Sequence, residues 1–242
     1  MTGRPEPATA AAGPTVDQAE RAADLAARLG VVRDRVVAAG RRVDDVRIVA
    51  VTKGFGPAAA DAAVRAGVTD LGENYAQELV GKAAAMSAHP AWHFLGPVQR
   101  NKVAALAPVV SCWHGLDRAA ALEAVAARQP GARVLVQVNL VGDPAKHGCA
   151  PGEAAGLVGR GRDLGLDVCG LMTVAAAGDR PGASRTFAAL ATLAGHLGVR
   201  ELSMGMSDDY DLAAAEGATM LRLGRALFGD RPPRPVGKDL SS

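Results

Sequence analysis

A lysine that directly follows an apolar run is the residue best suited to covalent chemistry in this chain. Lys53 comes immediately after residues 47–52 (RIVAVT), which have the pattern of a buried strand. Partial desolvation at the strand end would lower the pKa of its amine and free the lone pair for attack on an aldehyde. An ordinary solvated lysine is the alternative, and position alone favours it.

Two segments late in the chain could bind an anion. Gly205 and Gly224 each follow an apolar run, and glycine lets backbone N–H groups approach an anion closely. Ser203 and Ser207 could add hydroxyl donors. An imine-forming lysine together with a phosphate site fits a phosphorylated aldehyde, which could be either a bound cofactor or a sugar phosphate.

An ordinary helix start explains part of the same region. Ser207 or Asp208 fits the N-cap position, and Asp209 and Asp211 fit the first helical turn. This alternative accounts for the aspartates, but it explains Ser203 and Gly224 less well.

The elements that must position these residues alternate between short apolar strands and helices. A helix is predicted over residues 16–40 by the spacing of Leu25, Leu29, Val32 and Val36, and another near 182–197. Several strands are continuous apolar runs, as in a parallel sheet covered on both faces. The eight predicted strands are residues 46–52, 70–73, 92–95, 109–114, 133–140, 168–174, 201–204 and 220–223.

This alternation predicts a single (β/α)8 TIM barrel with an extra N-terminal helix, and an open doubly wound sheet is the alternative. Only residues 225–228 can be helical after the last strand, so the N-terminal helix is expected to cover that side. Residues 15–229 are predicted to form the one domain. Residues 1–14 and 230–242 read as flexible tails, because they are rich in proline and poor in packing groups.

Composition excludes several classes of function. The chain has 242 residues, 49% of them hydrophobic, and a net charge of +2 with no basic stripe, so nucleic acid is not expected as a partner. No run is long enough to span a membrane and no secretory signal is evident, which predicts a cytoplasmic protein. The three cysteines, Cys112, Cys149 and Cys169, fit a reducing compartment, and Cys149 is a candidate for a reactive loop thiol.

The histidines do not predict a metal site. His93 and His114 lie in the third and fourth strands without a carboxylate or cysteine at metal-ligand spacing, so hydrogen-bonded structural roles are expected. The polar residues 99–102 are expected to form a solvated helix start.

Five segments, in this order and spacing, resemble the pyridoxal-phosphate homeostasis protein family. They are AVTK (50–53), GENY (72–75), WHFLGPVQRNK (92–102), SMGMSDD (203–209) and RLGRALFG (222–229). The resemblance covers roughly residues 20–230. It implies a barrel like the N-terminal domain of alanine racemase, with pyridoxal 5′-phosphate as a Schiff base on Lys53.

The resemblance also implies the cofactor-binding residues. Ser203, with Met204 beside it, and the Gly224–Arg225 backbone would hold the phosphate. Arg222 would face the pyridine nitrogen and Asn74 would lie near the ring. The chain departs from the family at Arg225, where many relatives carry threonine, and in the segments 54–56 and 143–148.

The function implied by the resemblance is a monomeric carrier that buffers pyridoxal 5′-phosphate, supplies it to apo-enzymes and influences vitamin B6 and amino-acid balance without classical catalysis. A weak amino-acid racemase is the first alternative, with Tyr75 or Lys102 as the second base. A Schiff-base aldolase acting on a sugar phosphate is the second.

Overall fold

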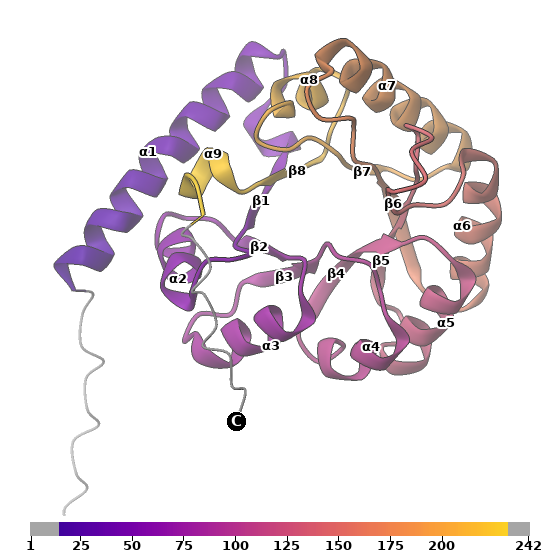
Figure 1. The fold of residues 1–242 in the computed structure, drawn as a ribbon, viewed down its shortest axis with the longest axis horizontal. Coiled ribbons are helices and arrows are strands. Elements are labelled where there is room, and N and C mark those ends of the chain that lie inside the picture. The colour runs from indigo at the N-terminus through magenta and orange to yellow at the C-terminus, as the bar shows by residue number, and fades with distance from the viewer. Residues whose placement is uncertain (1–14, 232–242) are drawn as a thin grey trace, which may run out of the picture.

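A computed structural model of the protein describes residues 15–231, which form one closed barrel of parallel strands surrounded by helices (Figure 1). The strands pair in chain order, and β8 pairs with β1 to close the barrel. The predicted (β/α)8 barrel is confirmed and the open sheet is wrong. The strands are β1 (Arg47–Val51), β2 (Asp70–Glu73), β3 (Ala91–Phe94), β4 (Val110–Leu116), β5 (Arg133–Gln137), β6 (Asp167–Met172), β7 (Glu201–Ser203) and β8 (Met220–Leu223).

Helices follow the strands and form the outer layer. They are α1 (Val16–Ala38), α2 (Pro57–Arg65), α3 (Ala76–Ala85), α4 (Arg100–Leu106), α5 (Ala119–Arg128), α6 (Ala154–Asp163), α7 (Arg180–Leu197), α8 (Tyr210–Ala215) and α9 (Arg225–Phe228). Two short 3₁₀ turns, η1 (Val43–Asp45) and η2 (Pro151–Glu153), lie in the connections. Within the described residues, no helix has the length and apolar character needed to cross a membrane.

The extra helix α1 closes the side on which the last helix is short. It begins at Thr15, whose side chain and that of Gln18 cap each other's backbone N–H groups. The four apolar residues predicted for its inner face are all buried. This helix packs against α2, α8 and α9, and α9 is the single turn expected from the sequence (Figure 1).

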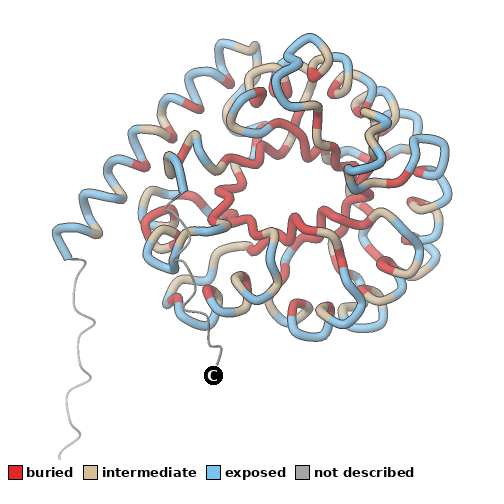
Figure 2. The backbone as a smooth tube through the Cα atoms, in the orientation of Figure 1, coloured by how far each residue is buried: buried red, intermediate tan, exposed pale blue. Residues whose placement is uncertain are grey.

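The barrel strands are buried almost throughout, as the tube in Figure 2 shows in red. Continuous burial of β8 on both faces explains why its sequence does not alternate. Aliphatic residues and alanine build most of this core, with Phe94 and Trp113 in edge-to-face contact at 5.8 Å between ring centroids.

Strand ends differ from their predicted positions by a few residues. β5 ends at Gln137, three residues before the predicted limit, although the ladder continues through Val138, whose N–H donates to the carbonyl of Met172 (2.8 Å). Val138 also bridges to Cys149, which ties the following loop to the barrel. Most of the predicted tails lie outside the described residues, with Asp230 and Arg231 as the exceptions.

Packing of α1 can be tested with a matched pair of substitutions. Leu29→Ala should lower the free energy of unfolding by roughly 2–5 kcal/mol, because Leu29 is only 2% exposed. Val31→Ala should change it by less than about 0.5 kcal/mol, because Val31 is 54% exposed on the same helix. Urea denaturation measures both, and equal losses would contradict a packed inner face.

Candidate functional site

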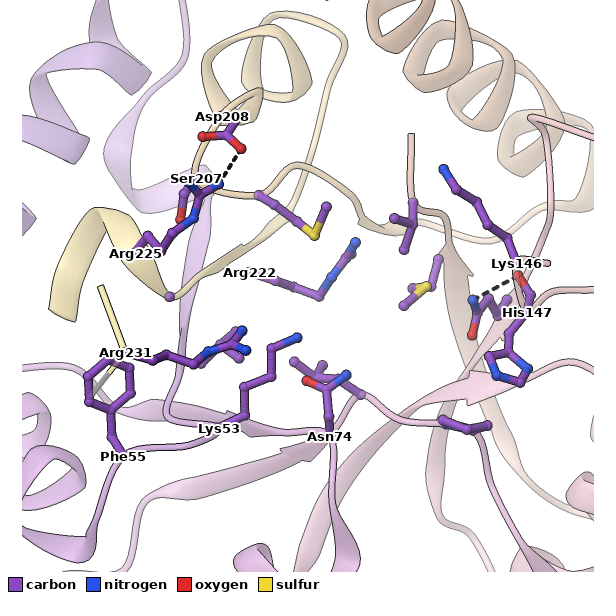
Figure 3. Close-up of a pocket in the computed structure, with 18 of the residues that line it drawn as sticks. Lys53, Phe55, Asn74, Lys146, His147, Ser207, Asp208, Arg222, Arg225 and Arg231 are labelled. Carbon is purple, nitrogen blue, oxygen red and sulfur yellow. Dashed lines mark hydrogen bonds and ion pairs between the residues drawn. The ribbon is translucent and has the colours of Figure 1, made fainter. Parts of the chain in front are cut away.

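A cavity of about 480 Å³ opens at the carboxyl ends of the strands. This is the end of a (β/α)8 barrel at which active sites lie, and the volume is within the usual range for small-molecule pockets. Figure 3 shows the side chains around it. Its polar and charged lining consists of Lys53, Asn74, Gln137, Lys146, His147, Ser207, Asp208, Arg222, Arg225 and Arg231.

The charge of this lining favours an anionic ligand. Lysine and arginine side chains enter from several elements, whereas Asp208 is the acidic residue among the described lining. Asp208 forms an ion pair with Arg225 and so neutralises one of these cations (Figure 3). The cations that remain attract a ligand such as a phosphate monoester.

Lys53 follows β1 and points into the cavity (Figure 3). Burial lowers the pKa of its amine, the charge of Arg231 lowers it further, and the charge of Glu73 partly opposes these effects. A larger fraction of the amine is therefore neutral near pH 7 than for a solvated lysine, and the neutral form is the nucleophile. The partial desolvation expected from the sequence is present.

A buried ionic cluster holds the backbone on both sides of Lys53. The ammonium of Lys82 donates to the carbonyl of Thr52 (2.7 Å) and pairs with the carboxylates of Glu73 and Glu78. Glu78 in turn accepts from the N–H of Gly54 (2.8 Å). These contacts fix the backbone of Thr52 and Gly54, which directly precede and follow Lys53.

Glu73 is the most constrained member of this cluster. Its Oε1 accepts from the hydroxyl of Thr52 (2.6 Å) and from Lys82, while its Oε2 is buried without a hydrogen-bond partner. Burial raises the pKa of Glu73, and the hydrogen bonds from Lys82 and Thr52 oppose that shift. Lys82 was missed by sequence reasoning, and its place three residues after the core residue Leu79 was the available signal.

Arg222 reaches the cavity from β8 but is held by groups beneath it. Its NH1 donates to the hydroxyl oxygen of Ser203 (2.7 Å) and its NH2 to the carbonyl of Thr173 (2.7 Å). Burial lowers the pKa of Arg222 to about 10 and the charge of Asp209 opposes the shift, so the guanidinium stays charged at neutral pH.

Five of the seven predicted cofactor-binding residues line the cavity, namely Lys53, Asn74, Arg222, Gly224 and Arg225. Ser203 and Met204 are fully buried and do not line it, contrary to their expected place. β7 ends at Ser203, whose side chain points into the barrel interior and bonds to His114 Nδ1 (2.8 Å) and Arg222. Ser207, four residues further along the chain, lines the cavity instead.

Ser207 links the loop after β7 to the loop after β8. Its hydroxyl accepts from the N–H of Ala226 (3.0 Å), beside the Gly224–Arg225 backbone. The N-cap of α8 is Asp209, so the alternative that placed Ser207 or Asp208 there is wrong. Gly205 has a φ of +85°, and an added Cβ would lie 2.5 Å from that of Ala213, which explains why only glycine fits this turn.

The two histidines form part of a hydrogen-bonded row, as expected, but a cysteine lies closer than the sequence suggested. Ligand atoms of His93, Cys112 and His114 all lie within 4.8 Å of one another. The four imidazole nitrogens already have partners, since the rings bond to each other (2.8 Å), to Asp70 (2.9 Å) and to Ser203 (2.8 Å). A structural role accounts for all of these contacts.

Several other candidates lie away from the cavity. Burial raises the pKa of Cys149 to about 11 and the residue is 4% exposed, which disfavours Cys149 as a reactive thiol. Neither Tyr75 nor Lys102 lines the cavity. The polar segment 99–102 forms the start of α4, as predicted.

Fold and site together define a (β/α)8 barrel with a cationic cavity at the carboxyl ends of its strands and a half-buried lysine in the cavity wall. The family model for the alanine racemase N-terminal domain matches residues 14–232. The chain is 39% identical over 222 residues to the pyridoxal phosphate homeostasis protein of Pseudomonas aeruginosa, covering 88% of this chain and 95% of the relative. It is 40% identical over 204 residues to that of Deinococcus radiodurans, covering 83% and 97%.

A solved structure extends the comparison. PipY of Synechococcus elongatus with pyridoxal phosphate bound superposes with a TM-score of 0.76 at 31% identity, covering 85% of this chain and all of the PipY chain (100%). The chain therefore belongs to the pyridoxal phosphate homeostasis protein family.

Because of the ionic cluster, we expect that replacing Lys82 on α3 strongly lowers the free energy of unfolding. Lys82→Met should destabilise the protein by about 3 kcal/mol, because it leaves the buried carboxylate of Glu73 without its cation. Lys102→Met on α4 is the matched control and should change stability by less than about 0.5 kcal/mol. Denaturant titration measures both, and a Lys82→Met loss as small as that of the control would contradict the role of the cluster.

Proposed function

We propose that this protein binds pyridoxal 5′-phosphate reversibly, as a Schiff base on Lys53, and acts in intracellular cofactor homeostasis and amino-acid balance. The observation that carries the proposal is a half-buried lysine of lowered pKa in a cationic cavity. The names of the curated relatives and the ligand of the PipY structure support this choice of aldehyde.

The residues present fit this cofactor. Ser207 and the Gly224–Arg225 backbone lie together on one side of the cavity and suit the phosphate. Asn74 lines the cavity on the side of Lys53 and suits the ring (Figure 3). When bound, the cofactor supplies an aldehyde and an electron-withdrawing ring.

Arg222 limits what that ring can do. A guanidinium that stays charged near the pyridine nitrogen disfavours protonation of that nitrogen, and this weakens the ring as an electron sink. Carbanion chemistry is thereby disfavoured, whereas imine formation and exchange are not. The side chain therefore suits a carrier better than a racemase.

The bases required by the racemase alternative lie in unsuitable places. Tyr75 is 52% exposed at the start of α3, and Lys102 lies on α4, and neither contributes to the described cavity wall. A racemase needs a second base on the opposite face of the substrate carbon. The carrier proposal needs no such group and includes delivery to pyridoxal-phosphate-dependent apo-enzymes by a monomeric cytoplasmic protein.

Lys53→Ala tests the proposal directly. The variant should lose the visible absorption of the protein–cofactor complex and any label trapped by borohydride, while its circular dichroism stays unchanged, because Lys53 contributes little to the core. Lys102→Ala should keep both the absorption and the trapped label. An unfolded Lys53→Ala variant, or one that still traps the cofactor, would contradict the assignment.

The same preparation separates the alternatives. Wild-type protein that forms no adduct with pyridoxal phosphate but is trapped by borohydride with a sugar phosphate would favour the aldolase. Conversion of L-alanine to D-alanine with a kcat of at least about 1 per second would instead favour the racemase.

The charge of Arg231 gives a pH-dependent prediction. Arg231→Gln should raise the pKa of Lys53, because the charge of Arg231 contributes to its lowering. The pH midpoint for the rate of colour formation with pyridoxal phosphate should then move upward, since less neutral amine is present at a given pH. Arg128→Gln on the outer helix α5 is the control, and a midpoint that moves equally in both variants would be inconsistent with this local effect.

A further inference from the structure

A continuous row of hydrogen-bonded side chains crosses the interior of the barrel. Asp70 Oδ1 lies 2.9 Å from His93 Nε2, and His93 Nδ1 lies 2.8 Å from His114 Nε2. His114 Nδ1 lies 2.8 Å from the hydroxyl oxygen of Ser203, which accepts from Arg222 NH1 at 2.7 Å. The row passes through β2, β3, β4, β7 and β8.

The row links the two ends of the barrel. Arg222 lines the cavity at the carboxyl ends of the strands, whereas Asp70 lines a second cavity of about 530 Å³ at their amino ends. Arg47 also borders this second cavity, with its Nε 3.4 Å from Asp70 Oδ1. Between these two ends, His93, His114 and Ser203 are at most 2% exposed.

The direction of each hydrogen bond follows from the chemistry of its ends. Burial acts to raise the pKa of Asp70, but hydrogen bonds from His93 and Thr69 and the charge of Arg47 outweigh it, so the pKa is lowered. Asp70 is therefore ionised and only accepts. Burial is the main cause that holds the pKa of His114 well below its usual range, and the charge of Arg222 acts in the same direction, so this ring is neutral.

With His114 neutral, one arrangement of donors and acceptors satisfies every group in the row. Ser203 donates its hydroxyl hydrogen to His114 Nδ1, His114 Nε2–H donates to His93 Nδ1, and His93 Nε2–H donates to Asp70. The Ser203 oxygen remains free to accept from Arg222. All the hydrogen bonds point from Arg222 toward the carboxylate, so each polarises the next in the same sense.

Arg222 needs such support because no carboxylate among residues 15–231 forms an ion pair with it. It is 5% exposed, and its hydrogen bonds go to a hydroxyl and a backbone carbonyl. A buried cation without a paired anion is unstable unless its neighbours are strongly polarised acceptors. The row makes the Ser203 oxygen such an acceptor and fixes the plane of the guanidinium.

We propose that Asp70, His93 and His114 are positioning residues that act through Ser203 to hold Arg222 against the ring-nitrogen side of bound pyridoxal phosphate. This inference rests on the proposed function, because it assigns a role toward that cofactor. It predicts that a change at the far end of the barrel alters the cofactor site.

Asp70→Asn tests the row with little change in shape. It should weaken binding of pyridoxal phosphate about tenfold and shift the pH midpoint of the visible absorption band. Glu201→Gln is the matched control, because Glu201 is a carboxylate at the same end of the barrel that bonds to Arg133 and Thr219 outside the row. The control should leave both quantities unchanged.

His114→Gln should shift the absorption midpoint in the same direction as Asp70→Asn. Because both changes interrupt one row, the double variant should add little to either single variant. Fully additive effects, or an Asp70→Asn variant indistinguishable from Glu201→Gln, would overturn the proposal.

A second measurement requires no cofactor and no variant. Nitrogen-15 NMR of the histidine rings in the wild-type protein should show that His93 and His114 each carry their ring proton on Nε2. A proton on Nδ1 of His114, or a charged ring at either position, would overturn the row as drawn.

A failure of the proposed function and a failure of the proposed role of the row give different results. Wild-type protein that fails to bind pyridoxal phosphate overturns the proposed function, and this inference with it. Wild-type binding through Lys53, combined with an unaltered Asp70→Asn variant, overturns this inference alone.

Discussion

The site depends on the hydrogen bonds between β1 and β8 that close the barrel. Val49 lies opposite Arg222 in this pairing, so closure brings the end of the first strand beside the last one. Lys53 and Arg222, which are distant in the sequence, consequently face the same cavity (Figure 3). Closure also places every strand's carboxyl end at one mouth, and an open sheet would separate these two residues.

Two kinds of support then hold the two cationic side chains. Beneath Lys53 lies an ionic cluster in which Lys82 pairs with Glu73 and Glu78 and fixes the adjoining backbone. Beneath Arg222 lies a row of neutral groups that ends in a distant carboxylate. The difference is functional, because a carboxylate paired directly with Arg222 would neutralise the charge that faces the cavity.

Much of this fold could be predicted because its patterns are local. The spacing of Leu25, Leu29 and Val32 predicted the buried face of α1, and the apolar run before Lys53 predicted both β1 and the position of its amine. Each of these features depends on residues within a few turns or one strand. The family resemblance, carried by several short motifs, is confirmed by the family model.

The predictions that failed concerned side chains whose direction or partners are set by distant parts of the chain. Ser203 and Ser207 both lie near the end of β7, and only the structure reveals that the first points into the barrel and the second toward the cavity. Lys82 was missed because a lysine in a short helix is usually solvated, and two of its partners, Thr52 and Glu73, lie outside that helix. The contact between His93 and His114 required the register of β3 and β4, which includes a shift between Trp92 and His93 that the sequence does not indicate.

The charges around Lys53 and at Arg222 bear on two different kinds of chemistry, imine formation and carbanion formation. An imine forms and exchanges readily when its amine is partly neutral, and burial together with nearby cations provides that condition at Lys53. Carbanion chemistry requires in addition a ring nitrogen that accepts a proton, and a charged guanidinium opposes this step. Arg222 keeps its charge despite deep burial, and under the proposed function this charge would favour holding an aldehyde over transforming an amino acid on it. The proposed retention and release of a reactive cofactor needs only the first of these conditions, and barrel closure and the ionic cluster around Thr52 and Gly54 both contribute to the position of the amine.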